Sequence, residues 1–480
     1  MKNKLNIIIP IIYLAISIFL SFTRVPFWDE ARAWLISQNC NPFEFLEMMK
    51  LECHFSLWYL AIFPFAKLDL FYPYSIYVLN SLFAFGAIYV LWNKSPFSTF
   101  QKLLITFGVP FLFLWGCVAR CYSIGILFLF IALSFYKKRA DKPFIYLTLL
   151  CLSLHTSVMA FIGCFYLILI FLFENIKNKN FLKFLSIFII ALFLISIQIY
   201  SPNPDYFKQA PEMGFLRDFT GYIFNPIFYI KQYGLQSILM SILRSSIIIC
   251  AFIFISFCAK NNRKILFFII PTYLSMVILF TFFYSGNFWH YFYFYLYFIV
   301  AIWIIKFENK ISKPLEIMIY IILIMFLFKG SLFIDSKLTT INDSKSNLIS
   351  AEIIKEYKNK KIFCLDPWGD ITPSSLPFLK EIIIYDKNNQ DRRSFKSMRN
   401  QIKFNTELFN PDDFAPYVTN NSILLTTSPF IKHEINNPLR QYDKNTGTIR
   451  FSGKKYIVDF IPYKFRKDIS LWAYLIKVYN

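Results

Sequence analysis

The sequence predicts an α-helical polytopic membrane protein with about eleven transmembrane helices, further helices along the outer membrane surface, and a small α/β domain outside the membrane. Composition is the first observation behind this fold class. The 480 residues are 56% hydrophobic, 20% aromatic and only 16% charged, which is far more apolar than a soluble domain. The second observation is that apolar residues form long runs bordered by Lys and Arg. The third is a change to polar, strand-like sequence after residue 334.

The apolar runs set the number of crossings, since a spanning helix needs roughly 20 apolar residues. Candidate runs cover residues 5–22, 74–92, 103–136, 143–174, 181–200, 235–258, 265–305 and 315–333. The runs 103–136, 143–174 and 265–305 are too long for one helix, and each has basic residues near both ends. Because basic residues concentrate in cytoplasmic loops, each of these runs is expected to cross twice, with its midpoint outside.

With the basic loops in the cytoplasm and an odd number of crossings, the sequence predicts a multi-pass protein of the cell membrane with a cytoplasmic N-terminus and an extracytoplasmic C-terminus. The first run has a basic start like that of a signal peptide, but no small-residue cleavage site follows it, so a retained anchor is expected. The formal net charge of +21 is explained by the basic loops. The expected surroundings are therefore membrane lipids, and no nucleic acid partner is predicted.

Three parts of the chain are expected outside the membrane spans, and one of them is a second large outer loop, 201–234, that is rich in proline and aromatic residues. The first outer loop, 23–73, mixes apolar and charged residues in segments too short to cross, which favours juxtamembrane helices. Residues 335–480 contain the strand-like runs "KIFCLDP", "EIIIYD", "SILLTTS" and "KYIVDFIPY", typical of a mixed α/β domain. The predicted domains are a transmembrane domain, 1–334, and an extracytoplasmic domain, 335–480.

The same topology brings ionisable residues from four segments to the outer face. Asp29 and Glu30 follow the first span, Arg120 and His155 lie at the turns of the first two hairpins, and His290 is beside the third turn. Ionisable residues close to apolar spans often mark functional sites. This coincidence is the main sequence evidence for a site.

Asp29 and Glu30 lie in the stretch "RVPFWDEARAW" and have two interpretations. Carboxylates at the start of an interfacial helix stabilise the helix dipole. Alternatively, Asp29 is a general base whose pKa is raised by partial burial and by the neighbouring charge. The aromatic residues around the pair fit either role.

Arg120 lies between two apolar helices, where a charge is costly unless it is paired or functional. It either extends to the outer headgroups or binds a phosphate through the bidentate hydrogen bonds of its guanidinium. Arg244 is a second candidate for the same phosphate. Tyr122 is either an interfacial aromatic residue or a part of this site.

The remaining candidates for a substrate pocket are polar residues near the same face: Arg32, His54, His155 and His290. The histidines lack the i, i+4 spacing of a metal site, so no metal ligand set and no cofactor is predicted, and dependence on a divalent metal stays open. The nine cysteines form no C-x-x-C pair and are interpreted as small core residues, with a Cys40–Cys53 disulfide as the alternative. No P-loop, G-x-G-x-x-G or G-x-S-x-G signature is present.

These features together resemble the GT-C superfamily of polytopic glycosyltransferases, especially the protein mannosyltransferase and lipid A aminoarabinose transferase type, over residues 1–334. The shared features are the acidic pair in the first outer loop, a His at the start of its second amphipathic segment, an Arg and a Tyr at an outer turn, and a soluble outer C-terminal region. Two details differ. The H-P-P-L motif of the family is His54-Phe55-Ser56-Leu57 here, and the acidic residue that often follows the outer-turn Arg is missing.

The resemblance implies a transferase that moves a sugar from a polyprenyl-phosphate donor to an extracytoplasmic acceptor (a glycan, a lipid or a protein), with inversion at the anomeric carbon. In this family the first-loop acidic motif supplies the catalytic carboxylate, which corresponds to Asp29 with Glu30 beside it. Arg120 would then bind the lipid phosphate. The alternatives are a transporter or flippase, a polysaccharide polymerase or ligase of the cell envelope, and a non-catalytic assembly protein.

Overall fold

The computed structural model describes residues 2–24, 26, 28–41, 43, 45, 49, 55–199, 262–280, 288–308 and 311–341, and seven strands between residues 362 and 479. Several predicted features lie outside these residues: Cys53, His54, Arg244, the outer loop 201–234 and the apolar run 235–258. What the sequence indicates about them stays a prediction.

Four of the described helices are long and apolar enough to cross a membrane: α1 (Lys2–Phe22), α5 (Tyr74–Lys94), α10 (Phe181–Ile199) and α14 (Phe288–Glu308). Large apolar side chains are exposed on α1, α5 and α10, for example Ile190 and Phe193 of α10 at 57% and 62%, whereas the described apolar side chains of α14 are mostly buried. Helices that satisfy their own backbone groups and show apolar side chains outward are suited to lipid. The chain is therefore an α-helical membrane protein.

The three long apolar runs are each divided between helices. Ser157, at the division of the second run, accepts a hydrogen bond from the backbone N–H of Ala160 at 3.1 Å and so caps a new helix. That every one of these helices crosses the bilayer stays a prediction. The helices are α6 (Thr99–Phe107), the π-helix η1 (Pro110–Trp115) and α7 (Tyr122–Ser134) in the first run, α8 (Pro143–Leu154) and α9 (Val158–Glu174) in the second, and α13 (Arg263–Ile278) and α14 in the third.

The remaining helices lie in the segment 23–73, in a basic loop and after α14. They are α2 (Trp28–Asn39), α4 (Leu57–Lys67), the short 3₁₀ helix η2 (Tyr136–Lys138) and α15 (Lys313–Ile341). Helix α15 continues past residue 335, where the soluble domain was expected to begin. Residues 331–341 contain no proline, so the residue that most strongly breaks a helix is absent there.

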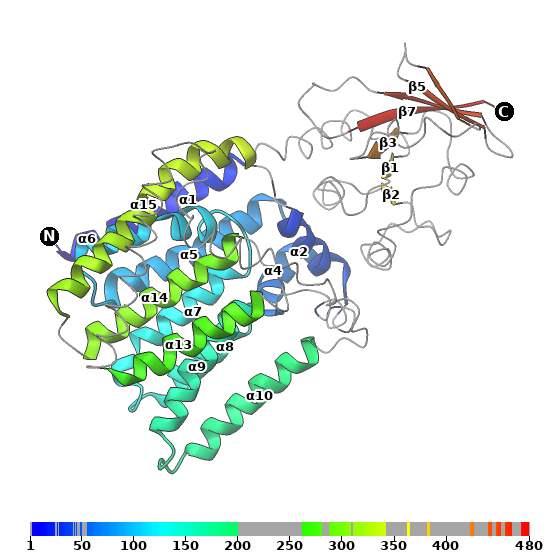
Figure 1. Cartoon of the computed structure of the whole chain (residues 1–480). Coiled ribbons are helices and arrows are strands. Elements are labelled where there is room, and N and C mark those ends of the chain that lie inside the picture. The colour runs from blue at the N-terminus through cyan, green and yellow to red at the C-terminus, as the bar shows by residue number, and fades with distance from the viewer. Residues whose placement is uncertain are drawn as a thin grey trace. The chain divides into compact units, whose positions relative to one another are not determined.

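The chain forms two compact units. The first contains Met1–Phe22, Pro42–Ala61 and Ile76–Ser336, and the second contains Thr23–Asn41, Ile62–Ser75 and Lys337–Asn480. In the first unit α7 packs on α8, α8 on α9, and α13 on both α9 and α14, and Figure 1 shows these helices as neighbours. Its core is rich in fully buried aromatic side chains such as Trp115, Tyr293 and Trp303.

The strands form one sheet in the order β2-β1-β3-β7-β6-β5-β4. The four predicted strand-like runs contain β1 (Ile362–Cys364), β2 (Ile382–Ile384), β3 (Ile423–Thr426) and β6 (Ile457–Pro462), whereas β4 (Arg440–Asp443), β5 (Thr448–Ser452) and β7 (Trp472–Tyr479) were missed. Strand β1 is parallel to β2 and β3, and the other pairs are antiparallel. The helices of the expected α/β domain fall outside the described residues and stay a prediction.

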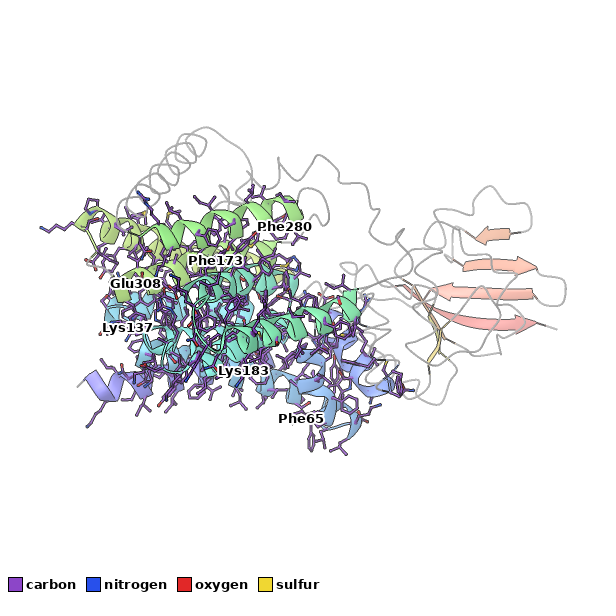
Figure 2. The ribbon with its side chains drawn as sticks, turned by 90° about the horizontal axis from the view of Figure 1, so that it is seen from below. Phe65, Lys137, Phe173, Lys183, Phe280 and Glu308 are labelled. Carbon is purple, nitrogen blue, oxygen red and sulfur yellow. The ribbon has the colours of Figure 1, made fainter. Side chains whose placement is uncertain are left out.

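The first unit has two chemically different ends. One, called the basic end below, joins segments that carry the predicted cytoplasmic Lys and Arg residues. There Lys306 donates to Gln101 at 2.9 Å, and Arg139 pairs with Glu174 at 2.7 Å. Figure 2 shows Lys137 and Glu308 at this end and Phe280 near the other. The other end holds Arg120 and is called the Arg120 end.

Candidate functional site

Arg120 occupies the turn between η1 and α7 and is only 9% exposed. Its backbone N–H donates to the carbonyl of Val118 at 2.9 Å, which tightens the turn. The guanidinium carbon lies 5.4 Å from the centre of the Tyr122 ring, a distance at which a cation is attracted to the face of an aromatic ring. The turn therefore holds a cation among aromatic side chains.

Tyr122 connects Arg120 to helices that are distant in the sequence. Its ring lies 6.2 Å from the His290 ring and 5.9 Å from the Tyr293 ring, both edge-on. His290 is 2% exposed. The Tyr293 hydroxyl lies 3.3 Å from the Ser157 hydroxyl, so the starts of α7, α9 and α14 meet at one end of the bundle.

The turn between α8 and α9 holds the residues that follow His54. The backbone N–H groups of Phe55 and Leu57 donate to the carbonyls of Thr156 and His155 at 3.3 and 3.4 Å. The N–H of Ser56 donates to the side chain of Gln198 at 2.8 Å. Residues 55–57, which directly follow His54, are thus fastened to this turn.

The imidazole of His155 lies in the same turn, outside both helices. Burial lowers the pKa of His155 below its usual value, with a smaller opposing contribution from a backbone hydrogen bond. The neutral form is therefore favoured at pH 7. A neutral imidazole can accept a hydrogen bond from a polar substrate or donate one to it.

The acidic pair belongs to the second unit, in the first turn of α2. Glu30 is fully buried, and its two oxygens contact both terminal nitrogens of Arg24, with Nη1 to Oε2 at 2.7 Å. Asp29 and Arg32 are half-buried. Glu30 is therefore held in a bidentate ion pair, and Asp29 is the more accessible carboxylate of the two.

The structure thus brings together some of the predicted site residues. Arg120, Tyr122 and His290 are neighbours, and the turn that contains His155 is linked to them through Ser157 and Tyr293. Asp29, Glu30 and Arg32 lie in the other unit, and His54 and Arg244 lie outside the described residues. Within the described part of the chain, no three His, Cys, Asp or Glu side chains are grouped so that they could hold a metal ion.

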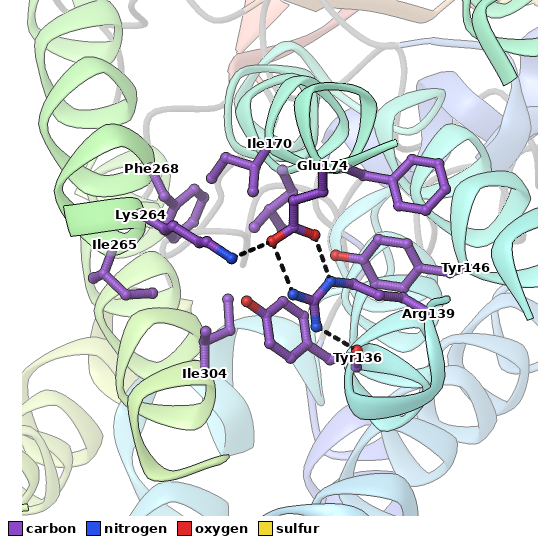
Figure 3. A pocket seen from close by; sticks show the side chains of 11 residues that line it. Tyr136, Arg139, Tyr146, Ile170, Glu174, Lys264, Ile265, Phe268 and Ile304 are labelled. Atoms are coloured by element: carbon purple, nitrogen blue, oxygen red, sulfur yellow. Dashed lines mark hydrogen bonds and ion pairs between the residues drawn. The ribbon is translucent and has the colours of Figure 1, made fainter. Parts of the chain in front are cut away.

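A second polar cluster, at the basic end, was not recognised in the sequence. Arg139 donates to both oxygens of Glu174 at 2.7 and 2.9 Å, and Lys264 donates to the same carboxylate at 2.7 Å (Figure 3). Tyr136 and Asn262 donate to the two oxygens of Glu308. We call these residues the latch.

Four latch residues, Tyr136, Arg139, Glu174 and Lys264, line a small hollow with room for about one water molecule, so a substrate does not fit there. It joins the end of α9, the start of α13, the end of α14 and the loop after α7. A sequence signal was available, because Glu174 and Glu308 are acidic residues at the ends of apolar runs otherwise bordered by basic residues.

No family model, no curated protein and no solved structure matches this chain.

Proposed function

We propose that this chain is a membrane glycosyltransferase that moves a sugar from a polyprenyl-phosphate donor to an acceptor outside the cytoplasm, with inversion. The observation that carries the proposal is the burial of Arg120 beside Tyr122 and His290 at one end of an apolar bundle. A guanidinium buried there is costly unless it is paired or serves a function, and its planar donors are well suited to a phosphate. The resemblance to the GT-C superfamily supports the same activity.

The proposed reaction is a single displacement. An acceptor hydroxyl oxygen attacks the anomeric carbon, the bond from that carbon to the phosphate oxygen breaks, and the polyprenyl phosphate leaves with the electron pair. The resemblance to the GT-C superfamily assigns the general base, which takes the acceptor proton, to Asp29. Arg120 stabilises the negative charge that develops on the departing phosphate.

The remaining parts of the proposal concern topology. We propose about eleven spans, a cytoplasmic N-terminus, and an extracytoplasmic α/β domain within residues 335–480. The Arg120 end then faces the outer leaflet, where a lipid donor can enter sideways from the membrane. The concentration of the described ion pairs at helix ends favours a transferase over a transporter, whose charges are expected along the midplane.

The direct test supplies radiolabelled polyprenyl-phosphate sugars to purified protein in vesicles and measures the release of free polyprenyl phosphate. A transferase releases it in the presence of an acceptor, whereas a flippase moves the intact donor. Arg120→Lys keeps the charge but loses bidentate geometry, so donor affinity should fall by about 1 to 3 kcal/mol, or roughly 5- to 150-fold.

The control is Arg139→Lys, the same change at the basic end, which should leave donor affinity unaltered. Unchanged donor affinity in Arg120→Ala would remove the phosphate-binding role of Arg120.

A further inference from the structure

We infer that Asn80 is a positioning residue for Arg120, and this inference rests on the proposed function. Asn80 lies in α5 and is fully buried. Its side-chain nitrogen donates to the carbonyls of Trp115 and Gly116, both at 3.0 Å. Its side-chain oxygen accepts a hydrogen bond from the Ser123 hydroxyl at 2.5 Å.

These three bonds span the turn that carries Arg120. Trp115 and Gly116 stand before the turn, at the end of η1, and Ser123 stands after it, in the first turn of α7. One rigid amide thus sets the separation between the two ends of the turn. The path of residues 117–121, and with it the place where the Arg120 side chain leaves the backbone, depends on that separation.

The end of η1 needs such partners because of its geometry. The last carbonyls of a helix have no intrahelical donor, and π-helical segments are rare and often lie at functional sites. In an apolar bundle each unsatisfied carbonyl is costly. Hydroxyls of α1 also donate in this stretch: Tyr13 donates to the carbonyl of Phe111 at 2.6 Å and Ser21 to that of Cys117 at 3.2 Å, and Ser17 shares the Gly116 carbonyl with Asn80 at 2.7 Å.

Gly116 allows the Tyr13 hydroxyl of α1 to lie close to the backbone at the end of η1. A Cβ built on it would lie 2.5 Å from the carbonyl oxygen of Leu112 and 2.6 Å from the Tyr13 hydroxyl. No side chain fits there without a backbone shift. The hydroxyl donors of α1 hold residues on the η1 side of the turn, whereas Asn80 holds both sides, and this difference distinguishes a positioning role from general stabilisation.

The first test is hydrogen exchange of the backbone amides of residues 117–123 in Asn80→Leu. These amides should exchange at least about fivefold faster for each lost hydrogen bond. The matched control is Asn262→Leu, because Asn262 is also a buried asparagine that donates and accepts hydrogen bonds, but at the basic end. Unchanged exchange in Asn80→Leu would overturn the inference. If that variant fails to fold, Ser123→Ala removes one of the three bonds and must show the same direction.

The second test is a double-mutant cycle with a polyprenyl monophosphate as the probe. Asn80→Leu should weaken its binding about as much as Arg120→Lys does, and should cause no further loss in an Arg120→Ala background. Additive losses would show that Asn80 acts independently of Arg120 and would overturn the inference. If Arg120→Ala alone leaves binding unchanged, the proposed function fails, and the exchange experiment still decides whether Asn80 holds the turn.

Discussion

Asp29 and Glu30 are neighbours in the sequence, but their surroundings assign them different tasks. Glu30 is buried and engaged by Arg24, whereas Asp29 is half-buried. If Asp29 is the acceptor base, Asp29→Asn should fold and bind donor but lose at least about a hundredfold in transfer rate, since a general base contributes roughly 10²- to 10⁴-fold. Initial rates of transfer at saturating donor measure this. Near-normal transfer would leave Asp29 with a role at the helix start alone.

Glu30→Gln should damage stability more than chemistry. The Arg24 side chain is 4% exposed and that of Glu30 is fully buried, so the substitution leaves a buried guanidinium without its charged partner. Breaking a buried pair in this way costs about 3 to 5 kcal/mol. A clear drop in the midpoint of thermal unfolding is expected, and an unchanged midpoint would contradict the structural role.

At the scale of elements, α9 and α14 pack through a glycine. The Tyr297 hydroxyl donates to the carbonyl of Met159 at 2.6 Å, and its ring lies over Gly163, where a Cβ would be 2.0 Å from the nearest ring carbon. Gly163→Ala should therefore lower the free energy of unfolding by about 1 to 3 kcal/mol, because the added methyl group overpacks this contact. Gly86→Ala is the control, because its Cβ would meet the end of the Leu127 side chain at 3.0 Å. Equal unfolding midpoints for the two variants would contradict this packing.

The latch acts on the same scale by joining helix ends. Glu174→Gln removes the charge that accepts hydrogen bonds from Arg139 and Lys264. The free energy of unfolding should therefore fall by about 1.5 to 3 kcal/mol, which is typical of hydrogen bonds to a charged group. Hydrogen exchange should also become faster at the end of α9 and the start of α13. Lys264→Gln removes a partner whose side chain is 55% exposed, and should cost about 0 to 1 kcal/mol. A larger effect for Lys264→Gln than for Glu174→Gln would reverse the assigned order.

At the scale of the whole molecule, the proposed function depends on which end faces the cytoplasm. Cysteines introduced at the exposed residues Lys138 and Lys177 of the basic end should react with a membrane-impermeant reagent only from the cytoplasmic side, because basic residues are retained there. A cysteine at position 420 should react from outside. Labelling of Lys138→Cys from outside would place the Arg120 end in the cytoplasm and contradict an extracytoplasmic site.

Within the described part of the chain, the sequence by itself determined where the apolar helices lie, where the long runs divide, and four of the seven described strands. These features are local, because run length, flanking charges and capping residues act within a few turns of chain. It also indicated that Arg120 and His290 lie at the same end of the helix bundle, because each lies at or beside the turn of a hairpin whose two ends carry basic residues. Strands β4 and β5 were missed because "RQYD" and "TIRFS" are short and largely polar and extend by pairing with neighbours.

Only the tertiary structure decided which polar groups are partners. Arg139 and Glu174 are 35 positions apart and Asn80 and Gly116 are 36 apart, and no local pattern relates them. The sequence singled out Asp29 as the candidate base but gave no partner for Glu30, whereas packing buried Glu30 against Arg24 and left Asp29 partly accessible. The physical reason is that burial and hydrogen-bond partners depend on which helix faces meet, and that is fixed by the summed contacts of the whole bundle.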